Sequence, residues 1–157
     1  MNNITRPISL WCALIIGCLL APVVQAGAEQ PIIHGAMIRE AKLQGFSLHY
    51  HLLDWKERNL LMKGMEGMEM PGMDRSGKAT HHLLLYLGGA DGKSIPAAKV
   101  GFQVTAPDGS VQKTLTMGMQ GGYGADVAMP AKGTYGIKMK ADLGEKPIVD
   151  EFAIVLK

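Results

Sequence analysis

A two-residue alternation of apolar and polar side chains first appears near residue 45. In Gly45–Leu53 (GFSLHYHLL) the large apolar and aromatic residues occupy every second position, with His49 and His51 between them. Successive side chains of a strand point to opposite faces, so this period predicts a strand with one buried face. Both histidines are expected on the other face.

A short helix is predicted directly after this strand. Asp54 fits a helix N-cap, and Glu57 stands three residues later, where an acidic side chain completes a capping box. The helix is expected to run from Asp54 to about Met62. Lys63–Lys78 (KGMEGMEMPGMDRSGK) then combines Gly, Pro and charged residues without a period, which predicts a loop, whereas 28–41 is a mixed lead-in.

The rest of the chain alternates between short apolar segments and turns. The predicted strands are His81–Leu87, Lys99–Ala106, Val111–Met117, Ala125–Met129, Thr134–Lys140 and Ile148–Leu156. Pro107-Asp108-Gly109 is a tight-turn sequence and predicts a hairpin between two of them. With the first strand, about seven strands result, which is typical of an all-β antiparallel sandwich.

The first 26 residues have the pattern of a secretory signal peptide. Arg6 precedes the apolar run Ser9–Val24, and Val24-Gln25-Ala26 resembles a cleavage site. The mature domain is then 27–157, and we expect it in the periplasm. Two alternatives stay open: a retained anchor helix, and a lipoprotein signal ending at Cys18. Because the apolar run continues past Cys18, we favour simple cleavage.

Composition narrows the functional classes. The chain has 157 residues, which predicts one domain, and its formal net charge is only +2. A nearly neutral chain lacks the basic footprint of a nucleic-acid-binding protein. Its two cysteines, Cys12 and Cys18, both lie in the predicted leader, so we expect no disulfide and no thiolate chemistry in the mature domain.

A cluster of methionines is the strongest chemical signal. Met62, Met65, Met68, Met70 and Met73 lie in or beside the predicted loop, residues 62–78, and Gly, Glu and Pro separate them. Thioether sulfur is a soft ligand that suits Cu(I). Methionine also fills gaps in cores and forms adaptable contact surfaces. Since the segment has no helical or strand period, we favour metal binding over a core role.

Histidines and a second methionine pair could complete such a site. The candidate imidazoles are His49 with His51 on one strand face, and His81 with His82 directly after the loop. Imidazole binds both copper oxidation states, so these residues are expected to matter more for Cu(II). Neighbouring strand residues point to opposite faces, so only one of His81 and His82 is expected to join the loop.

Met117 and Met119 share one strand face, and both a core role and a second soft pair fit their spacing. Met129 and Met139 lie on apolar strand faces and are expected in the core. The carboxylates are scattered, and no spacing suggests a catalytic triad, so we expect a protein that is not an enzyme.

Several short segments beyond residue 79 carry a family resemblance. They are His81-His82, Asp91-Gly92, Ala98-Lys99-Val100, Ala106-Pro107-Asp108-Gly109, Met117 to Met119 and Gly133-Thr134-Tyr135-Gly136-Ile137. In these, the chain resembles exported β-sandwich domains of the YtkA-like and FixH-like kind. The resemblance implies an immunoglobulin-like sandwich with a role near copper or haem–copper oxidases. It also implies ligand positions at His81, His82, Met117 and Met119.

These observations converge on one hypothesis. The chain is expected to be a periplasmic copper-binding protein that acts as a chaperone, store or resistance factor, with a periplasmic or inner-membrane copper-handling protein as partner. The alternative is a non-catalytic structural or adaptor domain of a periplasmic or membrane-associated assembly, which would use the methionine loop as a contact surface.

The leader generates the first testable prediction. We expect the exported protein to begin near Gly27 and to contain no cysteine, because Arg6, the apolar run and Val24-Gln25-Ala26 together specify cleavage. Intact mass and N-terminal sequencing of the periplasmic form measure this. A protein that starts at a lipid-modified Cys18, or that keeps residues 1–26, would contradict it.

Overall fold

The computed structural model describes residues 35–63, 71–74, 76–119, 121–144 and 146–157. The elements in chain order are β1 (Ala36–Leu43), β2 (Phe46–Asp54), α1 (Trp55–Leu61), β3 (His81–Gly88), β4 (Lys99–Thr105), β5 (Val111–Leu115), β6 (Met117–Met119), β7 (Gly122–Val127), β8 (Gly133–Asp142) and β9 (Ile148–Leu156). The predicted signal peptide, residues 1–26, lies outside the described residues and stays a prediction.

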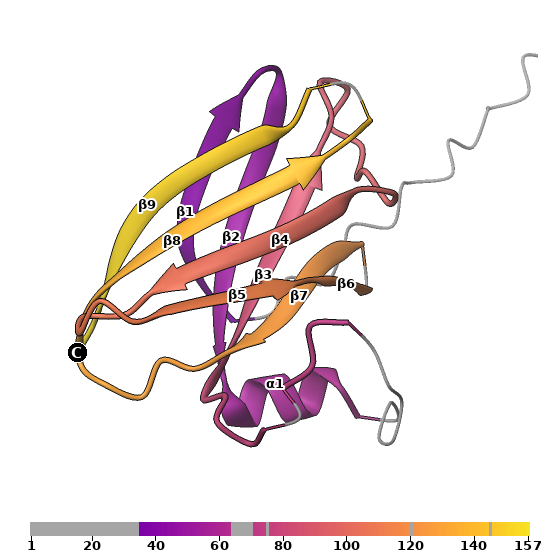
Figure 1. Cartoon of the computed structure of the whole chain (residues 1–157). Helices are drawn as coiled ribbons and strands as arrows, with labels where there is room; N and C mark the ends of the chain where they lie inside the picture. The colour runs from indigo at the N-terminus through magenta and orange to yellow at the C-terminus, as the bar shows by residue number, and fades with distance from the viewer. Residues whose placement is uncertain (1–34, 64–70, 75, 120, 145) are drawn as a thin grey trace, which may run out of the picture.

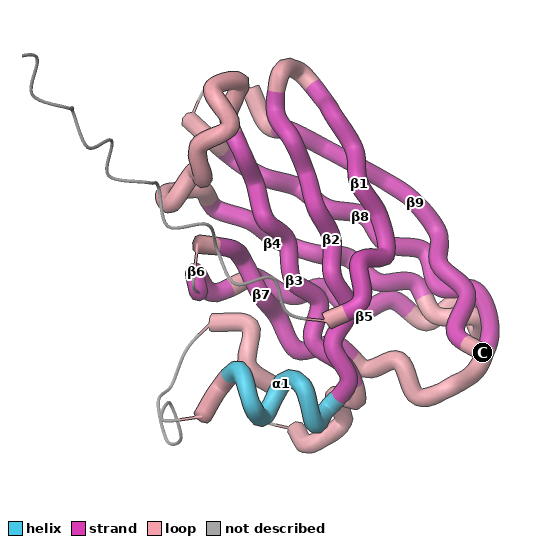
Figure 2. The backbone as a smooth tube through the Cα atoms, turned by 180° about the vertical axis from the view of Figure 1, so that it is seen from behind, coloured by secondary structure: helices cyan, strands magenta, loops and turns pink. Residues whose placement is uncertain are grey.

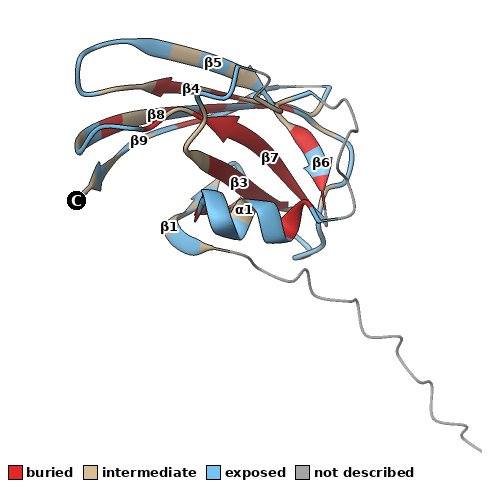
Figure 3. Ribbon diagram, turned by 90° about the horizontal axis from the view of Figure 1, so that it is seen from below, coloured by how far each residue is buried: buried red, intermediate tan, exposed pale blue. Residues whose placement is uncertain are grey.

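The strands form two antiparallel sheets packed face to face (Figure 1). Sheet A has the order β1-β2-β3-β7-β6, and sheet B has the order β5-β4-β8-β9. Figure 3 shows the two layers edge-on, with α1 on the outer side of sheet A. The predicted all-β antiparallel sandwich is therefore confirmed.

The core fills the space between the sheets. Sheet A contributes the alternate residues of the β2 pattern, such as Leu48 and Tyr50, and sheet B contributes Phe102 and Tyr135, all of them buried. Met129 and Met139 are also fully enclosed in this core, as their apolar strand faces predict. The inward half of each two-residue period is thus what holds the sheets together.

The structure has more strands than the roughly seven predicted from the sequence. One additional strand is β1, which falls where the sequence suggests only a mixed lead-in. Its pairing register with β2 shifts between Met37 and Arg39. A bulge of this kind breaks the two-residue period, so the alternation that marks other strands is lost here.

The second additional strand comes from a division of the predicted segment Val111–Met117. The chain leaves sheet B at Thr116, whose backbone N–H and hydroxyl both donate to the carbonyl oxygen of Val100, each at 3.0 Å. It then continues in sheet A as β6, which pairs with β7. One edge of the sandwich is therefore closed by a single bent chain that belongs to both sheets.

The helix α1 begins as its sequence predicts. The Asp54 carboxylate accepts from the Glu57 N–H at 2.8 Å, and the Glu57 carboxylate accepts from the Asp54 N–H at 2.8 Å, which completes the capping box. Figure 2 shows α1 at one end of the sandwich, below β2 and β3. In the described part of the chain, no helix has the length and apolar character to cross a bilayer.

The opposite edge of the sandwich is closed by an ion pair between the two sheets. Arg39 on β1 donates to both carboxylate oxygens of Asp150 on β9, at 2.8 and 2.9 Å, and its guanidinium also lies over the Phe152 ring. Burial would raise the pKa of Asp150, but the hydrogen bonds and charge of Arg39 outweigh burial and hold that pKa below its usual value.

We expect Asp150→Asn to lower the free energy of unfolding by about 1–3 kcal/mol near neutral pH, because it leaves Arg39 without its carboxylate. The depressed native-state pKa makes this contribution complete above the unfolded-state Asp pKa of about 4, and it is lost as the pH falls through the native-state pKa. Urea denaturation of both proteins as a function of pH measures the difference, which should narrow only at acid pH.

The neighbouring substitution Glu151→Gln is the matched control. Glu151 pairs with Lys138 at 3.1 Å, but both side chains are well exposed, so the expected change is within about 1 kcal/mol. If Asp150→Asn cost no more than Glu151→Gln at neutral pH, the ion pair would not stabilise this edge.

Candidate metal centre

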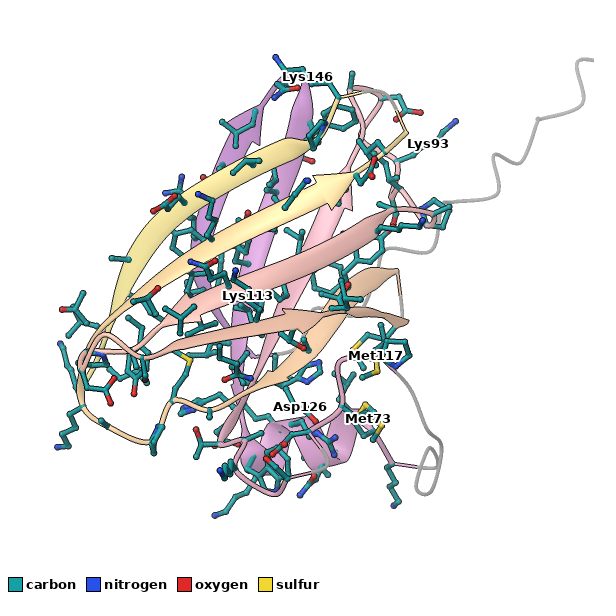
Figure 4. All side chains as sticks on the ribbon, in the orientation of Figure 1. Met73, Lys93, Lys113, Met117, Asp126 and Lys146 are labelled. Carbon is teal, nitrogen blue, oxygen red and sulfur yellow. The ribbon has the colours of Figure 1, made fainter. Side chains whose placement is uncertain are left out.

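A second apolar cluster lies on the outer face of sheet A, separate from the main core. It collects most of the described methionines outside that core, and its buried members are Leu53, Leu61, Met62, Leu84, Tyr86, Met117 and Met119. Met73, which is half-buried, packs against them. In Figure 4, Met73, Met117 and Asp126 lie together beside α1.

Asp126 on β7 is the polar centre of this region, and its side chain is fully buried. Its carboxylate accepts four hydrogen bonds: from His82 Nδ1 at 2.8 Å, from two nitrogens of Arg58 at 3.1 and 2.8 Å, and from the Asp74 N–H at 3.0 Å. Burial alone would raise the pKa of Asp126, but these hydrogen bonds together lower it to about 2. The carboxylate is therefore ionised at neutral pH.

This ionised carboxylate determines how the His82 ring is used. Asp126 can only accept, so His82 Nδ1 must carry a hydrogen and donate it. In the neutral ring the lone pair then belongs to Nε2. Nε2 faces the sulfur of Met119 at 3.3 Å, and His82 is fully buried. Two atoms that can each donate a lone pair to a metal ion therefore face each other in a buried position.

Gly124 on β7 provides the space for this contact. A β-carbon at this position would clash with His82 Nε2 and would lie 2.6 Å from the Met119 sulfur. Gly124 pairs with Leu84 on one side and with Met117 on the other, in the middle of the outer face. The missing side chain lets an imidazole from β3 reach a thioether from β6 across the intervening strand.

The segment that carries Met73 is fixed to the same strand. The Asp126 N–H donates to the Gly72 carbonyl oxygen at 2.8 Å, and the Asp74 N–H donates to the Asp126 side chain. Gly72 has φ +83°, and a β-carbon there would lie 2.5 Å from the Leu115 carbonyl oxygen. Only glycine allows so close an approach in this conformation, and the result places Met73 beside Met117 and Met119.

The donor atoms of this region could share one metal ion. His82 Nε2 and the Met119 sulfur lie 3.3 Å apart, and each has a lone pair to donate. Met117 and Met73 belong to the same cluster, so their thioethers are further candidate donors.

The other histidines are placed elsewhere. His81 lies next to His82 but points to the opposite face, half-buried, with Nδ1 2.8 Å from Thr80 Oγ1. Burial lowers the pKa of His81, although the nearby Asp54 charge acts in the other direction. Strand alternation places the two imidazoles on opposite faces, and the structure brings His82 to Met119.

His49 and His51 share the outer face of β2, as alternation predicts, but their surroundings differ. His51 is buried, with Nδ1 3.2 Å from the Gly35 carbonyl oxygen and its ring edge-on to Tyr86. Its Nε2 has no hydrogen-bond partner among the described residues, and His49 is half-buried. Their expected role as Cu(II) ligands stays a prediction.

The remaining predicted ligands divide into two groups. Met62 is buried at the end of α1 and belongs to the outer cluster. Met65, Met68 and Met70 lie outside the described residues, so their contribution stays a prediction. Within the described ranges, no group of three or more His, Cys, Asp or Glu side chains converges as a metal site. The assembled donors are therefore one imidazole and several thioethers.

The site predicted from the sequence does not include two residues of this region, Asp126 and Arg58. Asp126 is a single carboxylate inside an otherwise apolar strand, and such a residue needs buried partners. The position of Asp126 in the sequence therefore indicates a buried, partnered carboxylate. Arg58, which lies in α1 and stacks on Trp55 at 4.7 Å, carries no comparable mark, because an arginine on a short helix is ordinary.

We expect Gly124→Ala to lower the free energy of unfolding by about 1–3 kcal/mol, because the added methyl group overpacks the space between His82 and Met119. Gly136→Ala is the control: its new β-carbon would meet only Thr105 Cβ, at 3.6 Å, so stability should change by less than about 0.5 kcal/mol. Urea denaturation measures both. Equal stability of the two variants would show that the contact is loosely packed.

The similarity of this chain to known proteins is one of fold. No protein-family model matches it, and no curated protein matches its sequence. A copper-bound variant of FetP from uropathogenic Escherichia coli strain F11 is similar in structure, with a TM-score of 0.51, 18% identity, and coverage of 74% of this chain and 93% of FetP. A DUF4426 family protein from Pseudomonas aeruginosa PAO1 is also similar, with a TM-score of 0.51, 14% identity, and coverage of 75% and 96%. The expected resemblance to exported β-sandwich domains is confirmed at the level of fold.

Proposed function

We propose that this chain is a periplasmic Cu(I)-binding protein that carries or stores the ion and does not catalyse a reaction. His82, Met119, Met117 and Met73 hold the ion, and a periplasmic or membrane-bound copper protein receives or supplies it. The observation that carries the proposal is the approach of His82 Nε2 and Met119 Sδ to 3.3 Å in a buried, fully oriented pair.

The chemistry of the donors favours Cu(I) over harder ions. Thioethers are soft, neutral ligands, and imidazole accepts either oxidation state. Asp126 cannot serve as a ligand while both its oxygens accept from Arg58, His82 and Asp74. Its charge is already balanced by Arg58. A buried site of neutral donors favours a monovalent cation, because the cost of desolvating an ion rises steeply with its charge.

The positioning of His82 follows a pattern known from metal proteins. A ligating histidine commonly donates its second ring N–H to a carboxylate, which fixes the ring and raises its basicity. Asp126 supplies that carboxylate, and Arg58 fixes Asp126 in turn. The copper-bound FetP variant adds support, since a protein of similar fold binds copper.

Anaerobic competition with a chromophoric Cu(I) chelator tests the proposal on the mature protein. We expect Met119→Leu to weaken Cu(I) binding by at least about tenfold, because leucine keeps the apolar volume and removes the sulfur. Met139→Leu is the matched control: Met139 is buried in the main core, so its replacement should leave Cu(I) affinity unchanged.

A third variant, with Met65, Met68 and Met70 all changed to leucine, measures what the rest of the methionine cluster adds. The sequence predicts that Met65, Met68, Met70 and Met73 provide most of the Cu(I) affinity, in which case this variant loses more than Met119→Leu. If Met119→Leu bound Cu(I) as tightly as the wild type, the proposed site at His82 and Met119 would be wrong. Absence of Cu(I) binding by the wild type would favour the adaptor role.

A further inference from the structure

No described helix or strand covers the outer face of sheet B (Figure 1), and several lysines lie on this face. Strand register places Lys113, Gln103 and Lys138 side by side on β5, β4 and β8. The next row across the sheet is Leu115, Gly101, Lys140 and Val149, and Lys99 lies beyond it, opposite Asp142. Figure 4 shows Lys113 in the middle of this face.

Most of these positive charges are not neutralised within the described part of the chain. Lys138 pairs with Glu151 at 3.1 Å. The second acidic residue of the face, Asp142, accepts from the Gly144 N–H at 3.0 Å and makes no ion pair among the described residues. Lys99, Lys113 and Lys140 have no carboxylate partner there. The face therefore presents an excess of positive charge that an anionic partner could neutralise.

The same face also carries most of the exposed large aliphatic side chains of the described residues. Val111, Leu115, Val149 and Val155 are between 45% and 67% exposed, and all four belong to sheet B. Gly101 leaves a gap between Leu115 and Lys140, and a groove of about 500 Å³ lies over it. A groove lined by both exposed aliphatic side chains and lysines without a described carboxylate partner is unusual for a surface that only meets water.

We propose that this groove, the sheet B groove, binds an extended acidic peptide segment of a partner protein that also carries aliphatic side chains. The row from Leu115 to Val149 crosses four strands, about 14 Å, which is the length of four or five extended residues. An extended peptide presents alternate residues to one side, so its aliphatic side chains can contact Leu115 and Val149 while the long lysine side chains around them reach its carboxylates. The concave shape favours such a chain over a flat lipid surface.

The position of the groove has a consequence for the metal centre. His82 and its sulfur neighbours lie on the outer face of sheet A, whereas the groove lies on the outer face of sheet B. A partner docked in the groove would leave the metal centre uncovered. The inference does not depend on copper binding, and each can fail without the other.

Fluorescence anisotropy with two labelled peptides tests this inference. The probe alternates Glu and Val, and the comparison peptide alternates Gln and Val. We expect the mature protein to bind the Glu/Val peptide at least about tenfold more tightly, with an affinity that falls as salt is added. Lys113→Gln combined with Lys140→Gln, and separately Leu115→Ser, should each weaken binding several-fold.

Lys93→Gln combined with Lys146→Gln is the matched control. It removes the same charge at the end of the molecule away from Lys113 (Figure 4), and neither lysine lines the groove, so binding should stay near the wild-type level. If the control and the Lys113/Lys140 variant lost the same affinity for the Glu/Val peptide, net charge alone would explain the effect and the proposed site would be wrong. No binding of the Glu/Val peptide, or binding of phosphatidylglycerol vesicles in its place, would also overturn the proposal.

Discussion

The buried carboxylate of Asp126 is the constraint on which the outer face of sheet A depends. A charge without solvent must be matched by donors, and this one takes them from β3, from α1 and from the segment before Ser76. Helix α1 therefore has a fixed place although it is only seven residues long. The same four hydrogen bonds orient His82 and hold Met73 near Met117 and Met119. The contacts that satisfy the buried charge therefore also position the candidate ligands.

The two sheets are joined in different ways at the two edges of the sandwich. On the β1 and β9 side, Arg39 and Asp150 join the sheets through side chains. On the β5 and β6 side, the backbone itself passes from one sheet to the other at Thr116. The two strand methionines follow this crossing directly. Covalent continuity therefore limits how far Met117 and Met119 can move relative to either sheet.

The sequence predicts the fold more fully than the site. The two-residue period of Gly45–Leu53 and the capping residues Asp54 and Glu57 are local signals, and the structure reproduces both. β1 is not predictable from its pattern, because a bulge erases its two-residue period. The pairing of His82 with Met119 spans 37 positions and depends on the order of strands in sheet A, which no local pattern encodes. The residue types were therefore predictable, but their partners were not.

In β7 (Gly122–Val127), the number of residues decides which side chains face the core. Tyr123, Ala125 and Val127 face the main core, while Gly122, Gly124 and Asp126 face outward. Loss or gain of one residue would exchange these two sets: the carboxylate would enter the core, and Tyr123 or Ala125, depending on the direction of the shift, would fill the gap beside His82. Substitutions here act on one face at a time, but a single deletion would destroy both, so in this strand the number of residues matters as much as their kind.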